Sequence, residues 1–170
     1  MYYRVMSQYV QALKNVDAWL DKAEQHADRK RFDVNVLMTS RLAPDMAHFI
    51  YQVQSACDYA KGAAAWLSGQ KPPKHEDNET TISETRVRLK KTIAFIEGVR
   101  EDQYAGATER KVTVSWGPAG SVLRADDYLL QVSIPNVYFH LMAAYAILRH
   151  NGVAVGKQDF LGPINWINPR

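Results

Sequence analysis

The chain has a single cysteine, Cys57, among its 170 residues. One thiol excludes an internal disulfide framework and any zinc site built from several thiolates. Neither sign of charge predominates strongly, because 21 Lys and Arg against 18 Asp and Glu leave a net charge of only +3. Domains that bind nucleic acid normally concentrate basic residues in one patch. We therefore expect no nucleic-acid partner.

No apolar leader with a small-residue cleavage site opens the sequence, so we expect a cytoplasmic protein without a secretory signal. The longest stretch free of Asp, Glu, Lys and Arg runs from Tyr128 to Leu148 and is long enough to cross a bilayer. Polar residues interrupt it, among them Gln131, Asn136 and His140, and lipid would leave these groups without water. We expect the buried helix of a soluble bundle here, and no membrane partner.

Glycine-rich phosphate loops, Ser/His/Asp constellations and stripes of alternating basic and aromatic residues are absent as well. The composition, 46% hydrophobic and 23% charged, is that of an ordinary globular chain. The length suits one domain, residues 1–170. Composition therefore excludes several classes of function without identifying one.

Apolar residues recur at helical spacing in four stretches, which cover about 3–27, 43–69, 81–99 and 126–150. Pro44 suits the first position of the second helix. Thr81 and Glu84 have the spacing of a capping box at the start of the third helix, and Asp126 is the expected cap of the fourth. Four helices of this length predict an all-α four-helix bundle.

Two features interrupt the helical pattern. Residues 111–116 and 121–124 alternate around a Gly-Pro-Ala-Gly turn, which predicts a short β-hairpin before the last helix. Pro135 falls inside the fourth helix and predicts a kink. The tail from Val153 to Arg170 is expected to pack on the bundle without regular structure. The predicted buried face of the fourth helix consists of Leu130, Ile134, Val137, Leu141 and Leu148.

The second helix carries a thiol and, just after it, a pair of oppositely charged side chains. Cys57 falls on the apolar face, so we expect a buried and inert thiol. Asp58 and Lys61 have the spacing of an exposed ion pair of small value. Neither position identifies a reaction.

Several motifs together resemble a known family. Residues 136–152 read NVYFHLMAAYAILRHNG and residues 156–162 read GKQDFLG, while the second helix region contains RLAPDM at 41–46, QVQ at 52–54 and DYAKG at 58–62. Over essentially the whole chain these motifs resemble the uncharacterised DUF1993 family of the DinB/YfiT-like superfamily. The resemblance implies an up-down-down-up bundle, often a homodimer, with no activity assigned to this branch.

The wider superfamily includes metal-dependent enzymes, among them thiol transferases that hold a metal with three histidines. One histidine lies on the second helix and a His-x-x-x-His pair lies on the fourth. The resemblance places His140 at the second position of that pair and Asn136 at the first, with His48 as the one histidine of the second helix. The implied ligands of a divalent ion such as zinc or nickel are thus His140, His48 and Asn136. An amide oxygen is a poor ligand for such metals, so we expect a degenerate site.

Helical periodicity groups the polar residues differently. With about 100° per residue, His48 points roughly 145° away from the apolar face of its helix, whereas Gln52 lies nearer to that face. Asn136 and His140 are four residues apart and lie one above the other. We therefore expect Gln52, Asn136 and His140 to share a small polar cavity. A buried histidine bonded to a neighbour is the simpler interpretation of His140.

Two functions remain open at this point. The first is a cytoplasmic, dimeric binding or structural module with a polar cavity around His140 and no strong metal site. The second is a metal-dependent enzyme, similar to thiol transferases or hydrolases, in which a divalent ion would bind and acidify a thiol or water. Tyr59 and Trp66 share the outer side of the second helix with His48 and predict a second apolar surface there, such as a subunit interface. The ligand itself is not predictable.

Overall fold

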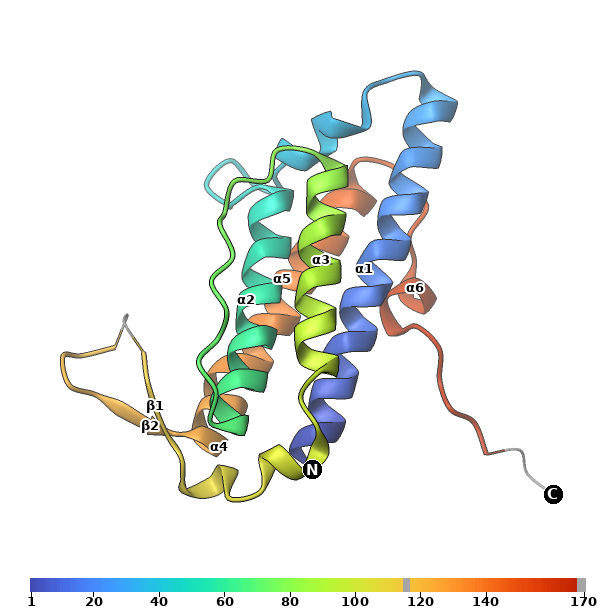
Figure 1. Cartoon of the computed structure of the whole chain (residues 1–170). Coiled ribbons are helices and arrows are strands. Elements are labelled where there is room, and N and C mark those ends of the chain that lie inside the picture. Colours follow the sequence, from blue (N-terminus) through green and yellow to red (C-terminus); the bar gives the residue numbers. More distant parts are fainter. Residues whose placement is uncertain (115–116, 168–170) are drawn as a thin grey trace.

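Four long helices form the body of the molecule in a computed structural model, which describes residues 1–114 and 117–167. They are α1 (Tyr2–Lys30), α2 (Phe49–Ser68), α3 (Ile82–Glu97) and α5 (Ile134–His150). Helix α1 runs up, α2 and α3 run down and α5 runs up (Figure 1). The predicted up-down-down-up bundle is confirmed. No helix within the described ranges combines the length and apolar character needed to cross a bilayer.

A long connection makes two consecutive helices parallel. After α2 ends at Gly69, residues 70–80 run back along the whole bundle to the end where α2 began (Figure 1). Helix α3 then starts with the predicted capping box, in which Glu84 N donates to Thr81 Oγ1 at 3.2 Å and Thr81 N donates to Glu84 Oε2 at 3.0 Å. We call residues 70–80 the strap, because they lie across α2 and α3.

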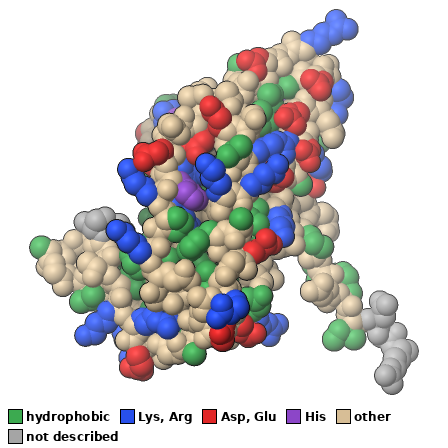
Figure 2. Space-filling view, in the orientation of Figure 1, with side chains coloured by type: hydrophobic (Ala, Val, Ile, Leu, Met, Phe, Trp, Pro, Cys, Tyr) green, Lys and Arg blue, Asp and Glu red, His purple; other side chains and the backbone are tan. Residues whose placement is uncertain are grey.

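The core lies between α1, α2, α3 and α5, and α2 packs against both α3 and α5. Alanines on α2 make this central position possible, because their small side chains let neighbouring helices come close. The buried alanines are Ala56, Ala60, Ala63, Ala64 and Ala65. On the outside, acidic and basic side chains are interspersed over the face shown in Figure 2.

Short elements connect the long helices. The 3-10 helices are η1 (Val34–Thr39), η2 (Glu101–Tyr104) and η3 (Ala107–Glu109), and α4 (Ala125–Asp127) precedes the π-helical segment η4 (Tyr128–Ser133). The predicted hairpin is present, with β1 (Lys111–Thr113) antiparallel to β2 (Val122–Arg124). Ser115 and Trp116, which the sequence also places in the first strand, lie outside the described residues.

The start of the second helix was predicted too early. Helix α2 begins at Phe49, and Pro44 lies in a turn before it. The loop is closed by Phe49 N, which donates to the Ser40 carbonyl at 3.0 Å, and by Arg41, which binds the Met46 carbonyl. These tertiary bonds hold the backbone in a turn where local pattern alone favours helix.

In η4, the segment that leads into the last helix, the buried face is not the one predicted. Leu130 is 57% exposed and Leu129 is buried, although the predicted stripe had Leu130 inside. The wider turn of η4 adds a residue before α5, which rotates the preceding residues around the axis. Pro135 then lies in the first turn of α5, where its missing amide costs little. Asp126 was wrong as a cap, because it lies inside the first turn and pairs with Arg124 at 3.2 Å.

The tail packs on the bundle as predicted only as far as Leu161, and part of that stretch is helical. Helix α6 (Lys157–Leu161) lies against α1, where Trp19 Nε1 donates to the Asp159 carbonyl at 3.0 Å. Gly156 N donates to Asp159 Oδ2 at 2.8 Å and so closes the first turn, a local signal that the sequence analysis missed. Residues 162–167 then run away from the body, with Trp166 79% exposed, so the predicted packing of this part of the tail is wrong (Figure 1).

Candidate functional site

Helices α2 and α5 bring Gln52 and His140 together. His140 Nδ1 lies 2.8 Å from Gln52 Oε1. The other end of the same amide, Gln52 Nε2, donates to the Ala47 carbonyl at 2.9 Å. Gln52 is only 2% exposed, so its side chain is held by these two bonds inside the bundle.

Three aromatic rings surround the imidazole of His140. The Tyr59 ring is stacked on it with the centroids 5.9 Å apart and an interplanar angle of 14°. Tyr51 and Phe139 meet it edge-on, at 6.3 Å and 5.2 Å. Burial among these groups lowers the pKa of His140 below its ordinary range, because a charged imidazole loses hydration there. Burial therefore favours the neutral ring.

The other predicted site residues have local roles. Asn136 donates its side-chain amide to the Val132 carbonyl at 2.7 Å, one turn earlier in the same helical run. His48 is the cap of α2, since its Nδ1 accepts from Tyr51 N at 3.3 Å. Burial and the nearby Arg41 lower the pKa of His48. The structure thus joins Gln52 to His140 and leaves Asn136 and His48 engaged with the backbone.

These residues do not fit the metal that the superfamily implies. Zinc sites normally use three good protein ligands, of the imidazole, thiolate or carboxylate kind. His140 supplies one imidazole, and its neighbours Gln52 and Asn136 are amides that are already hydrogen-bonded. Within residues 1–114 and 117–167, no group of three His, Cys, Asp or Glu side chains is placed to hold an ion.

A groove of about 570 Å³ runs along the outer side of α2, and we call it the α2 groove. Its aromatic walls are Tyr51, Tyr59, Trp66 and Tyr128. Gly62 also lines it, and a Cβ at this position would lie 3.1 Å from the Tyr128 hydroxyl. Because Tyr51 and Tyr59 also contact the His140 ring, the groove and the Gln52–His140 pair adjoin each other.

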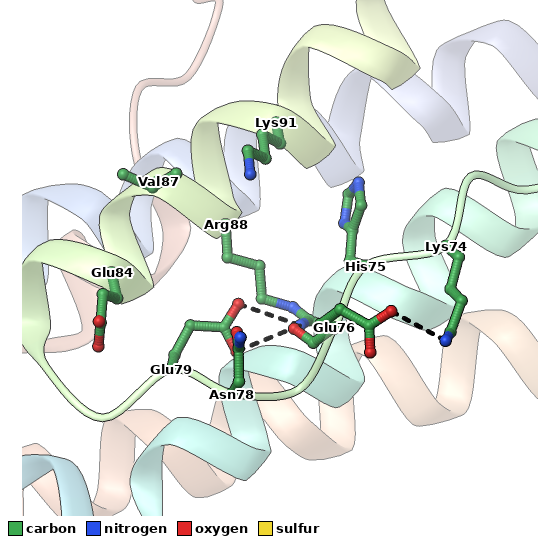
Figure 3. Close-up of a pocket in the computed structure, with 9 residues that line it drawn as sticks. All are labelled: Lys74, His75, Glu76, Asn78, Glu79, Glu84, Val87, Arg88 and Lys91. Carbon is green, nitrogen blue, oxygen red and sulfur yellow. Dashed lines mark hydrogen bonds and ion pairs between the residues drawn. The ribbon is translucent and has the colours of Figure 1, made fainter.

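A buried arginine fastens the strap beside this groove. Arg88 of α3 pairs with Asp58 of α2 at 2.9 Å and with Asp77 and Glu79 of the strap at 2.8 Å and 3.2 Å. It also donates to the Glu76 carbonyl at 3.1 Å. Figure 3 shows the guanidinium reaching from α3 to the strap at a second cavity, of about 400 Å³. The strap is thereby tied to α2 and α3.

Two polar residues of α2 complete this ionic cluster. Lys61, 5% exposed, pairs with Asp58 at 2.8 Å. Gln54 donates to Glu79 Oε2 at 2.8 Å. Burial alone would raise the pKa of Glu79, but the bonds from Gln54 and Arg88 outweigh burial and lower it.

The importance of this cluster was missed by the sequence analysis, which took Asp58 and Lys61 for an exposed pair. The available signal was the acidic run at residues 76–79, which has to be neutralised by some cation if the loop packs on the bundle. Cys57 lies next to the cluster and is fully buried. Burial raises the pKa of its thiol to about 12, so it stays protonated and inert, as expected.

Comparisons with known proteins agree with this architecture. A family model described as a domain of unknown function (DUF1993) matches residues 1–161. A crystal structure of a DinB family member protein from Shewanella denitrificans is 43% identical, with a TM-score of 0.91, and the alignment covers 96% of this chain and 93% of that chain. Among curated proteins, none matches. The chain therefore belongs to the DUF1993 family of DinB-like proteins.

Proposed function

We propose that this chain is a cytoplasmic binding protein that takes a small molecule into the α2 groove, beside His140, without a resident metal ion. The observation that carries the proposal is the character of the groove. Small-molecule sites typically measure roughly 300–1,000 Å³ and combine aromatic walls with a few fixed polar groups. The α2 groove, at about 570 Å³, has four aromatic side chains and the ion pair of Asp58 and Lys61.

The residues of the site support binding more than covalent chemistry. Gln52 and His140 do not line the groove, but their hydrogen bond and ring stacking hold Tyr51 and Tyr59, which do. The one thiol, Cys57, is buried and protonated. A metal-assisted reaction, the rival function, would need ligands that the neighbours of His140 do not supply.

Filling the groove tests the proposal. Ser55 lines its wall, and Ser55→Trp would place an indole in the space that a ligand needs. We expect some members of a panel of neutral aromatic fragments to shift amide resonances of α2 residues 51–66 and of the strap. In Ser55→Trp these fragments should bind more than about tenfold more weakly, because the groove is occupied.

The matched control is Ser83→Trp, which adds the same side chain at an exposed position of α3 outside the groove. Its fragment affinities should equal those of the wild type. Fragments that bind Ser55→Trp as tightly as the wild type, or that shift residues far from α2, would contradict the proposed site.

We further propose that the protein forms a homodimer through the outer face of α5 and η4. Leu130, Phe139 and Met142 are 57%, 59% and 54% exposed, and Tyr138 beside them is 38% exposed. No Asp, Glu, Lys or Arg lies between Tyr128 and Leu148. A two-fold interface brings the same patch of two copies together, so a face without charge meets itself without repulsion.

Met142→Glu should convert the dimer to monomers, because two carboxylates would then be buried near the two-fold axis. Sedimentation velocity measures the change directly. Val87→Glu is the control, since Val87 is 48% exposed on α3 and lies outside the proposed interface. A wild-type chain that sediments as a monomer at every concentration would contradict the dimer.

A further inference from the structure

The segment that follows α6 is apolar and carries no charge. Residues 160–167 contain no Asp, Glu, Lys or Arg. Ile164, Trp166 and Ile167 are 48%, 79% and 94% exposed. Segments that stay disordered in water are normally rich in polar and charged residues and poor in aromatic and β-branched ones. Residues 162–167, which we call the arm, have the opposite composition, which is typical of a segment that packs against protein.

The start of the arm is fixed on α1. Asn15 Nδ2 donates to the Phe160 carbonyl at 3.0 Å, and Gly162 then turns the chain with a φ of +70°. A Cβ at position 162 would lie 2.5 Å from Asn15 Oδ1, so this turn requires glycine. Pro163 follows and restricts the backbone further. The arm therefore leaves the bundle in a defined direction, and Figure 2 shows apolar side chains on the extension that projects beyond the body.

The arm starts at the edge of the proposed dimer face. Tyr138, Met142 and Tyr145 are spaced by four and three residues, so they lie along one side of α5. Phe160 of α6 meets the Tyr145 ring edge-on at 5.8 Å. An extended chain of six residues spans about 20 Å, whereas Tyr138 lies only about 10 Å along the helix from Tyr145. A second copy seated on this side of α5 is therefore within reach of the arm.

The exposed apolar area favours a second copy as the partner. The outer residues of α5 and η4 (Leu130, Tyr138, Phe139 and Met142) are 38–59% exposed and offer about 400 Å² per copy. Stable interfaces bury roughly 800 Å² per partner. The exposed side chains of the arm add about 400 Å² more. The two surfaces together reach the size of a stable interface, and neither brings a charge that has to be buried.

Resting on the homodimer proposed above, we propose that each arm crosses to the second copy and packs Trp166 and Ile167 on the outer face of that copy's α5. Tryptophan is the side chain most often found at the energetic centre of an interface. A two-fold axis repeats every contact, so the dimer exchanges two arms. The arm thus finds on the partner the packing that its own bundle does not provide.

Replacing the exposed side chains of the arm tests this exchange. In the full chain, Trp166→Ala should weaken the dimer about thirtyfold or more, the loss expected at a central interface tryptophan. Combining Ile164→Ser, Trp166→Ser and Ile167→Ser should weaken it more than about a hundredfold, because each dimer then loses six apolar side chains. Sedimentation velocity over a concentration series measures both effects.

The matched control is Val87→Ala, which shortens an exposed apolar side chain of α3. Its dimer should be as tight as that of the wild type. All of these variants should keep the circular dichroism spectrum of the wild type, because the replaced side chains are exposed in the single chain.

A spin label on the arm shows which copy the arm contacts. Asn165→Cys adds an exposed thiol, whereas Cys57 is buried and stays unlabelled. The spin-labelled chain is mixed with a ¹⁵N-enriched chain that carries no label, so any broadening of ¹⁵N amides comes from the other copy. We expect broadening at residues 138–145 of α5. A label at Ser83→Cys, on the exposed side of α3, should broaden these amides far less.

Each outcome bears on one claim. A triple variant that dimerises as tightly as the wild type would overturn the exchange of arms and leave the dimer through α5 intact. Broadening of α5 that appears only when the label and the ¹⁵N lie on the same chain would also overturn it, because the arm would then pack on its own helix. A wild type that stays monomeric at every concentration would contradict the dimer and the exchange together.

Discussion

Replacing Arg88 with alanine should lower the free energy of unfolding by about 3–5 kcal/mol, the usual cost of breaking a buried ion pair from one side. The Arg88 side chain is 1% exposed and faces three carboxylates, of which Glu79 is buried at 9% exposed while Asp58 and Asp77 are 42% and 59% exposed. Without the guanidinium these carboxylates repel one another beside the core. Urea unfolding followed by circular dichroism measures the loss, and hydrogen exchange should show faster opening of the strap.

A neighbouring arginine provides the control. Arg86 also pairs with three carboxylates, those of Asp17, Asp21 and Glu24. Arg86 is 18% exposed and its three partners are 34–61% exposed, whereas Arg88 and its partner Glu79 are 1% and 9% exposed, so Arg86→Ala should cost only about 1 kcal/mol. Equal losses at the two positions would show that burial of the Arg88 cluster does not determine its contribution.

Trp19→Ala should cost about 3–5 kcal/mol as well, because it empties a large buried site. Trp19 is 1% exposed, and its ring is stacked on Phe160 of α6 at 5.8 Å and meets Tyr145 of α5 edge-on at 5.8 Å. Its indole nitrogen also holds the Asp159 carbonyl. The variant should therefore lose stability and release α6, which limited proteolysis detects as cleavage after Lys157.

Trp19→Phe separates these two effects. The phenyl ring keeps most of the apolar volume but cannot donate to Asp159, so the loss should fall below that of alanine. If Trp19→Ala is cleaved at α6 no faster than the wild type, Trp19 does not hold the C-terminal helix in place.

Elements with local causes were predictable from sequence. The stripe of α1 and the capping box of Thr81 and Glu84 depend on residues within one or two turns, and both are present. The predictions of where α2 starts and of which face of η4 is buried were both wrong, for a common reason. Each depends on contacts or turn geometry that override the local pattern, at Ser40 and Arg41 in the loop and at the π-helical turn before Pro135.

The site was predictable to a similar extent. Gln52 and His140 lie near the inner faces of their helices, and periodicity together with family resemblance was enough to pair them. Arg88 was not found, because its partners Asp77 and Glu79 belong to a strap whose path no periodic pattern reveals. Tyr59 and Trp66, expected on a second apolar surface, line the α2 groove.

The structure explains the two short family motifs of α2, QVQ at residues 52–54 and DYAKG at residues 58–62, in the same way. In the first, Gln52 fixes His140 and Gln54 binds Glu79 of the strap. In the second, Asp58 pairs with Arg88 while Tyr59 stacks on the imidazole. Residues of both motifs, Gln54 from the first and Asp58 and Tyr59 from the second, therefore line the α2 groove, and Gln52 lies behind it with His140.

Metal content is the most direct test of the account, because the central claim is a ligand site beside a metal-free His140. The untagged protein, purified without chelators from cells grown with zinc and nickel, should contain far less than one transition metal ion per chain. Its melting temperature should not respond to either ion. A stoichiometric metal that disappears in His140→Ala would contradict the account and establish the metal-dependent alternative.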